Sequence, residues 1–155
     1  MYTRAAAVVV LLLCGCRGER LPTHPEVLRG TFTLTEVNRA PLPARVGARL
    51  SHSCPAGTEP RRWLKAGEVS FEEEEHAFDA LFTWEEHCVS PGGAATGQVY
   101  LSRDRGYYRR RGTVVRLYGP SDRYGYDPVY QGTLRGDTLR LASGGDTLVW
   151  LRARR

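Results

Sequence analysis

The chain of 155 residues carries 22 lysines and arginines against 17 aspartates and glutamates, which gives a formal net charge of +5 at pH 7. A chain of this length fits one domain whose core needs neither a metal nor a cofactor for stability, and it is too short for several large domains. Lys65 is the only lysine, so the positive charge is almost entirely arginine. We attribute that bias to a GC-rich genome rather than to a binding function.

The first part of the chain has the layout of a secretory signal peptide. A single positive charge at Arg4 precedes an unbroken apolar run from Ala5 to Leu13, and small residues follow the run. About nine apolar residues are too few to span a bilayer, whereas they suit the apolar region of an export signal. The sequence has no second long apolar stretch, so we expect no transmembrane helix downstream.

The end of this segment, Leu-Cys-Gly-Cys at residues 13–16, resembles the lipobox of bacterial lipoproteins. The resemblance implies that residues 1–15 are removed and that the Cys16 thiol carries diacylglycerol, which anchors the protein to a membrane. The alternative is an ordinary secreted protein, whose cleavage site would have a small residue where Leu13 stands. In such lipoproteins an aspartate directly after the lipidated cysteine favours the inner membrane. Arg17 stands there, so we expect an outer-membrane location in the cell envelope.

The rest of the chain divides into a tether and one domain. Residues 16–29 are polar with two prolines, which is typical of a flexible tether. Residues 30–155 alternate apolar and polar side chains, the pattern of half-buried strands. The expected strands are residues 31–35, 68–72, 76–85, 98–102, 113–118, 129–134, 138–141 and 147–151. We therefore expect a single all-β domain.

Turn signals separate the expected strands. Gly-Asp pairs at 136–137 and 145–146 each lead straight into an alternating run, and we expect a similar turn at 104–106. The four glutamates at 72–75 are expected at the solvated end of a hairpin. Eight or nine short strands joined by tight turns predict an up-and-down antiparallel meander that closes into a barrel, because closure removes exposed sheet edges.

Two cysteines, Cys54 and Cys88, remain once Cys14 and Cys16 are assigned to the signal peptide and the lipid anchor. A pair of cysteines in an exported domain favours a disulfide. One alternative is a zinc site that uses His52, Cys54 and Cys88, because residues two apart on a strand share a face. Free thiols are another alternative. We predict the disulfide and no metal site.

The sequence from Gly30 to Pro43, Gly-Thr-Phe-Thr-Leu-Thr-Glu-Val-Asn-Arg-Ala-Pro-Leu-Pro, resembles the opening of small bacterial lipoproteins with a lipocalin-like domain. Cys54 and Cys88 stand where that family has cysteines, and a strand at 97–101 and the two Gly-Asp turns also match it. The chain departs from the family at Arg39 and in an arginine-rich insertion. The resemblance implies a lipocalin-like barrel of about eight strands, a fold whose bacterial members mostly have no known ligand.

An eight-stranded barrel is either just filled by side chains or able to hold one small ligand. The aromatic residues that we expect to line such an interior are Phe78, Phe82, Trp84, Tyr100 and Trp150. The alternative is that these side chains simply fill the core. The leading hypothesis is therefore a ligand-binding or structural envelope lipoprotein, with a small apolar or lipid-like molecule as the ligand.

A second hypothesis is electrostatic. Five arginines gather near the turn expected at 104–106, namely Arg103, Arg105, Arg109, Arg110 and Arg111. Tyrosines accompany them as far as residue 130. Guanidinium groups bind phosphates and carboxylates in a two-pronged manner. In the envelope such a surface would meet anionic lipid headgroups, polysaccharide or another protein, and we expect no nucleic acid. The alternative is a solvated, arginine-rich hairpin.

The sequence has no Gly-x-Ser-x-Gly elbow, His-Glu-x-x-His motif or phosphate-binding loop. Of the four histidines, His24 lies in the expected tether and His76 follows the acidic run, so neither belongs to a built site. We expect a protein that is not an enzyme and that binds no cofactor.

Overall fold

The computed structural model describes residues 26–46, 54–120 and 127–153, and their regular structure consists of β-strands alone. The strands are β1 (Gly30–Val37), β2 (Ala40–Pro41), β3 (Ala44–Val46), β4 (Glu59–Glu72), β5 (Ala77–Val89), β6 (Ala95–Arg111), β7 (Val114–Tyr118), β8 (Tyr130–Arg135), β9 (Thr138–Ser143) and β10 (Asp146–Arg152). No helix with the length and hydropathy of a membrane span occurs among these residues. The signal peptide and the lipidated Cys16 expected from the sequence lie outside them.

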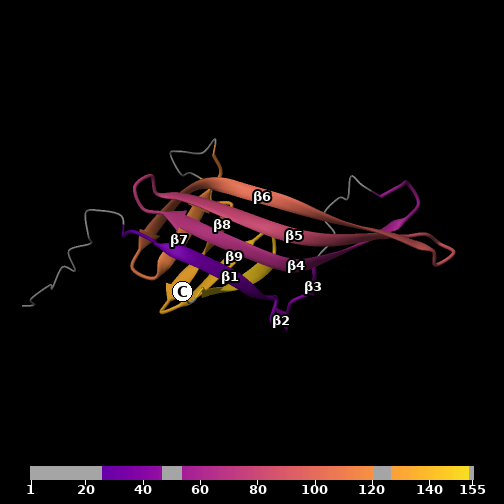
Figure 1. Ribbon diagram of the computed structural model, residues 1–155, viewed down its shortest axis with the longest axis horizontal. Coiled ribbons are helices and arrows are strands. Elements are labelled where there is room, and N and C mark those ends of the chain that lie inside the picture. Colours follow the sequence, from indigo (N-terminus) through magenta and orange to yellow (C-terminus); the bar gives the residue numbers. More distant parts are fainter. Residues whose placement is uncertain (1–25, 47–53, 121–126, 154–155) are drawn as a thin grey trace, which may run out of the picture.

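The sheet closes on itself through β1. The strand order is β2-β1-β10-β9-β8-β7-β6-β5-β4-β3, and β1 pairs in addition with β4. Phe32 of β1 lies opposite Arg152 of β10 on one side and opposite Val69 of β4 on the other. All pairings are antiparallel, so eight strands form the barrel, and the short β2 and β3 lie outside it (Figure 1). The predicted up-and-down barrel is confirmed.

Inward-facing side chains of every barrel strand fill the interior. Phe71 lies edge-on to both Phe32 and Tyr108, with ring centroids 5.8 Å and 5.4 Å apart. Trp150 packs against Phe82 at 5.6 Å. Each such aromatic pair adds about 0.5–1.5 kcal/mol to the free energy gained from area burial alone. All five rings are buried, so they form a packed core rather than an open lumen.

Three strands continue beyond the barrel and form an arm, made of residues 59–66 of β4, 83–89 of β5 and 95–102 of β6 (Figure 1). β6 has 17 residues, whereas β7 has five and β8 has six. The shorter strands end where β4, β5 and β6 are still paired with one another. The unequal strand lengths therefore leave a sheet of three long strands, bordered over residues 62–64 of β4 by the short β3, that projects from one end of the molecule.

Two expectations about boundaries are wrong. The turn expected at 104–106 lies inside β6, which continues to Arg111 because the arginine-rich segment pairs with β5 and then with β7. The tether is shorter than expected, because Leu28 is buried in the core. Its backbone N–H donates to the Tyr108 hydroxyl at 3.0 Å, and its carbonyl accepts from the same hydroxyl at 3.2 Å. The turns at both Gly-Asp pairs and after Glu72 are confirmed.

Close packing of neighbouring strands requires glycine at position 132. A Cβ added to Gly132 in β8 would lie 1.8 Å from the backbone oxygen of Arg140 in β9. Backbone cannot move aside as the end of a flexible side chain can. We therefore expect Gly132→Ala to lower the free energy of unfolding by about 2 kcal/mol or more, measured by urea unfolding followed through tryptophan fluorescence.

The control is Gly92→Ala in the turn between β5 and β6, where an added Cβ meets nothing within 4 Å. We expect that variant to unfold at nearly the wild-type urea concentration. Equal stability of the two variants would contradict the close approach of β8 and β9.

Candidate functional site

The candidate site is a cavity of about 260 Å³ at the root of the arm, where β4, β5 and β6 leave the barrel. Its apolar lining consists of Val46, Leu64, Phe82, Trp84, Tyr100 and Leu148. Its polar lining consists of Arg62, Ser102, Asp104, Tyr130, Ser143 and Asp146. Small-molecule sites are usually lined mainly by apolar and aromatic side chains with a few polar groups, and this cavity is more polar than that, because half of its lining residues are polar.

Strand pairing places the aromatic wall. Leu64, Trp84 and Tyr100 lie opposite one another on β4, β5 and β6, and they share one face of the sheet because side chains alternate along each strand. The Trp84 and Tyr100 rings are stacked with centroids 6.5 Å apart. The Trp84 indole N–H donates to the Ser102 hydroxyl at 2.7 Å, which fixes the ring in place. Phe82 continues the same face into the core.

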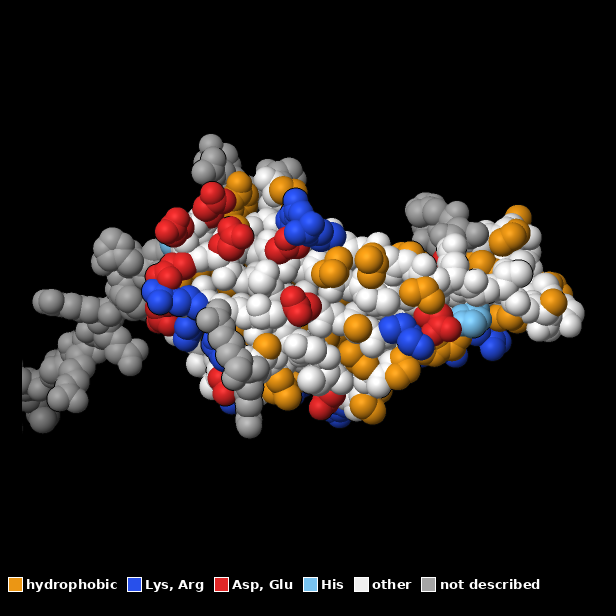
Figure 2. Space-filling view, viewed as in Figure 1, with side chains coloured by type: hydrophobic (Ala, Val, Ile, Leu, Met, Phe, Trp, Pro, Cys, Tyr) orange, Lys and Arg blue, Asp and Glu red, His pale blue; other side chains and the backbone are white. Residues whose placement is uncertain are grey.

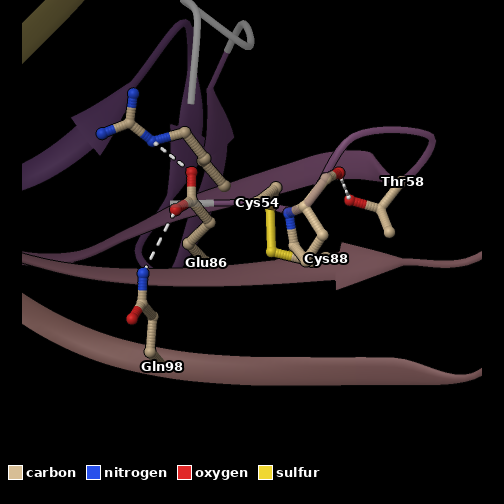
Figure 3. Close-up of a disulfide and its surroundings, with 7 residues drawn as sticks. Cys54, Thr58, Glu86, Cys88 and Gln98 are labelled. Atoms are coloured by element: carbon tan, nitrogen blue, oxygen red, sulfur yellow. Dashed lines mark hydrogen bonds and ion pairs between the residues drawn. A yellow bond between two sulfur atoms is a disulfide. The ribbon is translucent and has the colours of Figure 1, made fainter. Parts of the chain in front are cut away.

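A buried ion pair adjoins this wall. The Glu86 side chain is 2% exposed, and its Oε1 lies 3.4 Å from Nε of Arg62. The Gln98 amide donates to its other oxygen at 3.4 Å. A carboxylate shielded from water in this way needs a counter-charge, because the desolvation of an unpaired charge costs several kcal/mol. Figure 3 shows Glu86 beside Gln98 and close to the disulfide.

The Arg62 guanidinium also covers the aromatic wall. Its central carbon lies 5.0 Å from the Trp84 ring centroid and 5.8 Å from that of Tyr100, both within the range of cation–π attraction. It donates a hydrogen bond to the Tyr100 hydroxyl as well. Arg62 therefore joins the buried carboxylate to the two rings and sets the shape of the cavity on this side.

The rest of the lining carries acceptor groups. The Tyr130 hydroxyl donates to a carboxylate oxygen of Asp104, and the Asn38 amide donates to Asp146 at 2.8 Å. Both carboxylates line the cavity together with the Ser143 hydroxyl. The cavity thus combines an aromatic side with a polar side, an arrangement that suits a molecule with one apolar and one polar end.

Of the five aromatic residues expected to line an interior, Phe82, Trp84 and Tyr100 meet at this cavity. Trp150 packs on Phe82 in the core and does not line it. Phe78 lies further along β5, opposite Gly106 of β6, and borders a different hollow beside Pro120. The structure therefore gathers three of the five at one place and puts the other two into the packed barrel.

The predicted bond between Cys54 and Cys88 is confirmed: their sulfur atoms lie 1.98 Å apart (Figure 3). It ties the segment before β4 to the end of β5, on the arm. A zinc site through these thiolates is thereby ruled out, because both sulfurs are used in the bond. His52, the third ligand of that alternative, lies outside the described residues.

All five arginines of the electrostatic hypothesis lie on β6, and three of them have acidic partners. Arg103 donates to both carboxylate oxygens of Asp79, and Arg105 lies 3.5 Å from the same group. The hydrogen bond from Arg103 holds the pKa of Asp79 below its usual value. Arg110 pairs with Glu26 at 3.3 Å. Arg109 and Arg111 lie on the exposed outer side of β6, where Arg109 faces Arg116 of β7. Anion binding by this outer side stays a prediction.

Sequence reasoning missed the polar half of the site. Glu86 continues the alternation of Phe82 and Trp84, so an inward-facing carboxylate was detectable at the end of that run. Arg62 could not be found in this way, because the strand expected at 68–72 does not reach back to residue 59, where β4 begins.

Comparison of the chain with protein-family models, curated protein sequences and solved structures returned no match.

Removal of the positive partner of this ion pair is expected to lower the stability of the protein strongly. Arg62→Met leaves Glu86 buried without a counter-charge, and we expect the free energy of unfolding to fall by about 3–5 kcal/mol. The double variant Arg62→Met/Glu86→Gln removes both charges and is expected to recover much of that loss. Urea unfolding measures the free energy of unfolding of the wild type and both variants, because urea is uncharged and does not screen the ion pair.

The matched control is the neighbouring Arg61→Met. Arg61 pairs with Glu59 on the exposed side of β4, where both side chains are more than 40% exposed, and such pairs contribute about 0–1 kcal/mol. If Arg62→Met lowered the free energy of unfolding no more than Arg61→Met does, the buried Glu86 carboxylate would not need Arg62 as its counter-charge.

Proposed function

We propose that the protein is a lipid-anchored lipoprotein of the bacterial cell envelope whose barrel binds one small, largely apolar molecule at the root of the arm. The observation that carries the binding proposal is the cavity bounded by stacked Trp84 and Tyr100 on one side and by Ser143 and Asp146 on the other. The anchor rests on the lipobox-like sequence that ends at Cys16.

The volume of the cavity limits the size of the ligand. Pockets for drug-sized ligands measure about 300–1,000 Å³, and this one, at about 260 Å³, lies just below that range. Phe82 and Leu148 are buried beneath it, so a long chain cannot extend into the barrel. The proposed ligand is therefore a short or single-ring apolar molecule whose polar end reaches the hydroxyl and carboxylate groups of the rim.

Tryptophan fluorescence tests the binding proposal. We expect short-chain or single-ring alcohols, whose hydroxyl can donate to the rim carboxylates, to change the emission of a chain that begins at residue 17, because the half-buried Trp84 ring forms one wall of the cavity. Trp84→Phe should abolish the change. Trp63→Phe should preserve it, because Trp63 lies on the opposite face of β4, beside His87. The absence of any response to such ligands in the wild type would count against the proposal.

Metabolic labelling tests the anchor independently. Cells fed a palmitate analogue should label the full chain, and Cys16→Ser should lose the label because the acyl chains are attached through that residue. Cys14→Ser, which alters a cysteine of the segment expected to be removed, should keep it. A label that persists in Cys16→Ser would refute the anchor and leave the binding proposal untouched.

A further inference from the structure

β6 has an open edge over more than half of its length. Its residues 95–106 pair with β5 on one side, whereas its pairing with β7 on the other side begins only at Tyr107. No other described strand adjoins this stretch. The other unpaired stretches of the described strands are short: β2 and β3 have two and three residues, and β4 has no second partner at residues 59–61 and 65–67. Residues 95–106 of β6 therefore form the longest unpaired strand edge in the described part of the sheet.

The hydrogen bonds at the two ends of the β5–β6 pair show which backbone groups face outward. The Ser90 N–H donates to the Ala94 carbonyl at 2.8 Å, and the Tyr108 N–H donates to the His76 carbonyl at 2.7 Å. Bonded and non-bonded pairs alternate in an antiparallel ladder, and this one has no bulge. Even-numbered residues of β6 therefore bond to β5. The residues whose N–H and C=O groups point to the open side are Ala95, Gly97, Val99, Leu101, Arg103 and Arg105.

The edge lacks the devices that usually block further pairing. Charged side chains, prolines and bulges protect the edges of natural sheets, but residues 94–102 contain no charge and no proline. Val99 and Leu101 are 67% and 65% exposed on the outer side of the arm. Figure 2 shows hydrophobic side chains along the arm, interrupted by a group of basic, acidic and histidine side chains, while most of the acidic side chains lie toward the opposite end of the molecule.

We propose that β6 of a second copy of this chain pairs with this edge, antiparallel and about a two-fold axis, so that the two arms form one continuous six-stranded sheet. An antiparallel edge is complementary to itself under two-fold rotation, because each open N–H meets a carbonyl of the other copy. The uncharged residues 94–102 match the same residues of a second copy and offer no charge to attract a charged peptide.

The open stretch is centred on Tyr100, which sets the register. Val99 of one copy then lies opposite Leu101 of the other, and the four exposed aliphatic side chains meet on one face. Arg103 lies opposite Gly97 of the second copy, so no arginine faces an arginine. Arg103 is already paired with Asp79 within its own chain, so it brings no unpaired positive charge to the contact.

Sedimentation of the full chain in mild detergent, together with amide hydrogen exchange, tests the dimer. We expect a dimer in which the odd-numbered amides from 95 to 103 become protected as concentration rises. Even-numbered amides of the same stretch are bonded to β5 and should be protected at every concentration. Val99→Lys places like charges in the apolar cluster and should raise the dissociation constant at least about tenfold.

The matched control is Leu151→Lys, an exposed leucine on β10, which is paired on both sides. It should dimerise as the wild type does, and circular dichroism should show both variants folded, since surface substitutions rarely change stability much. A monomeric wild type would overturn the proposal. So would a dimer that survives Val99→Lys, or one in which the odd-numbered amides stay unprotected, because either would use another surface.

Discussion

The unequal lengths of neighbouring strands determine most of what is distinctive in this molecule. β6 stays paired with β5 over its first half, while β7, β8 and β9 have already ended. The arm, the open edge of β6 and the cavity at the root of the arm all follow from that difference. Strands of equal length would leave neither an arm nor an open edge.

The site lies at the mouth because the interior is full. Trp150, Phe82, Phe71 and Tyr108 occupy the space that a larger barrel would leave for a ligand. Concave space remains only where the arm continues one wall past the others. There the side chains can be polar, because water reaches the rim, and this explains why serines and carboxylates face the aromatic wall. Arg62 and Glu86 pair with each other within the arm, just beyond this point.

Local patterns were enough to predict the eight barrel strands but not their extent. Residues 76–85 predict β5 because an apolar side chain occurs at every second position. The first half of β4 escaped detection because a bulge after Leu64 shifts the period and because Arg61 and Arg62 hide the alternation. The prediction of a turn at 104–106 is wrong because these residues have partners on other strands: Asp104 accepts from Tyr130, and Arg105 pairs with Asp79. The Arg62–Glu86 contact depends on strand register, which no local pattern specifies.

The seam at β1 imposes an order on folding. From β4 to β10, each barrel strand pairs with the one that follows it in the chain, so those contacts close short loops at little entropic cost. Phe32 and Arg152, by contrast, stand at opposite ends of the domain and meet only when the final strand has been made. Until then β1 can be held by β4 alone. A chain that lacked β10 would therefore leave the edges of β1 and β9 without partners.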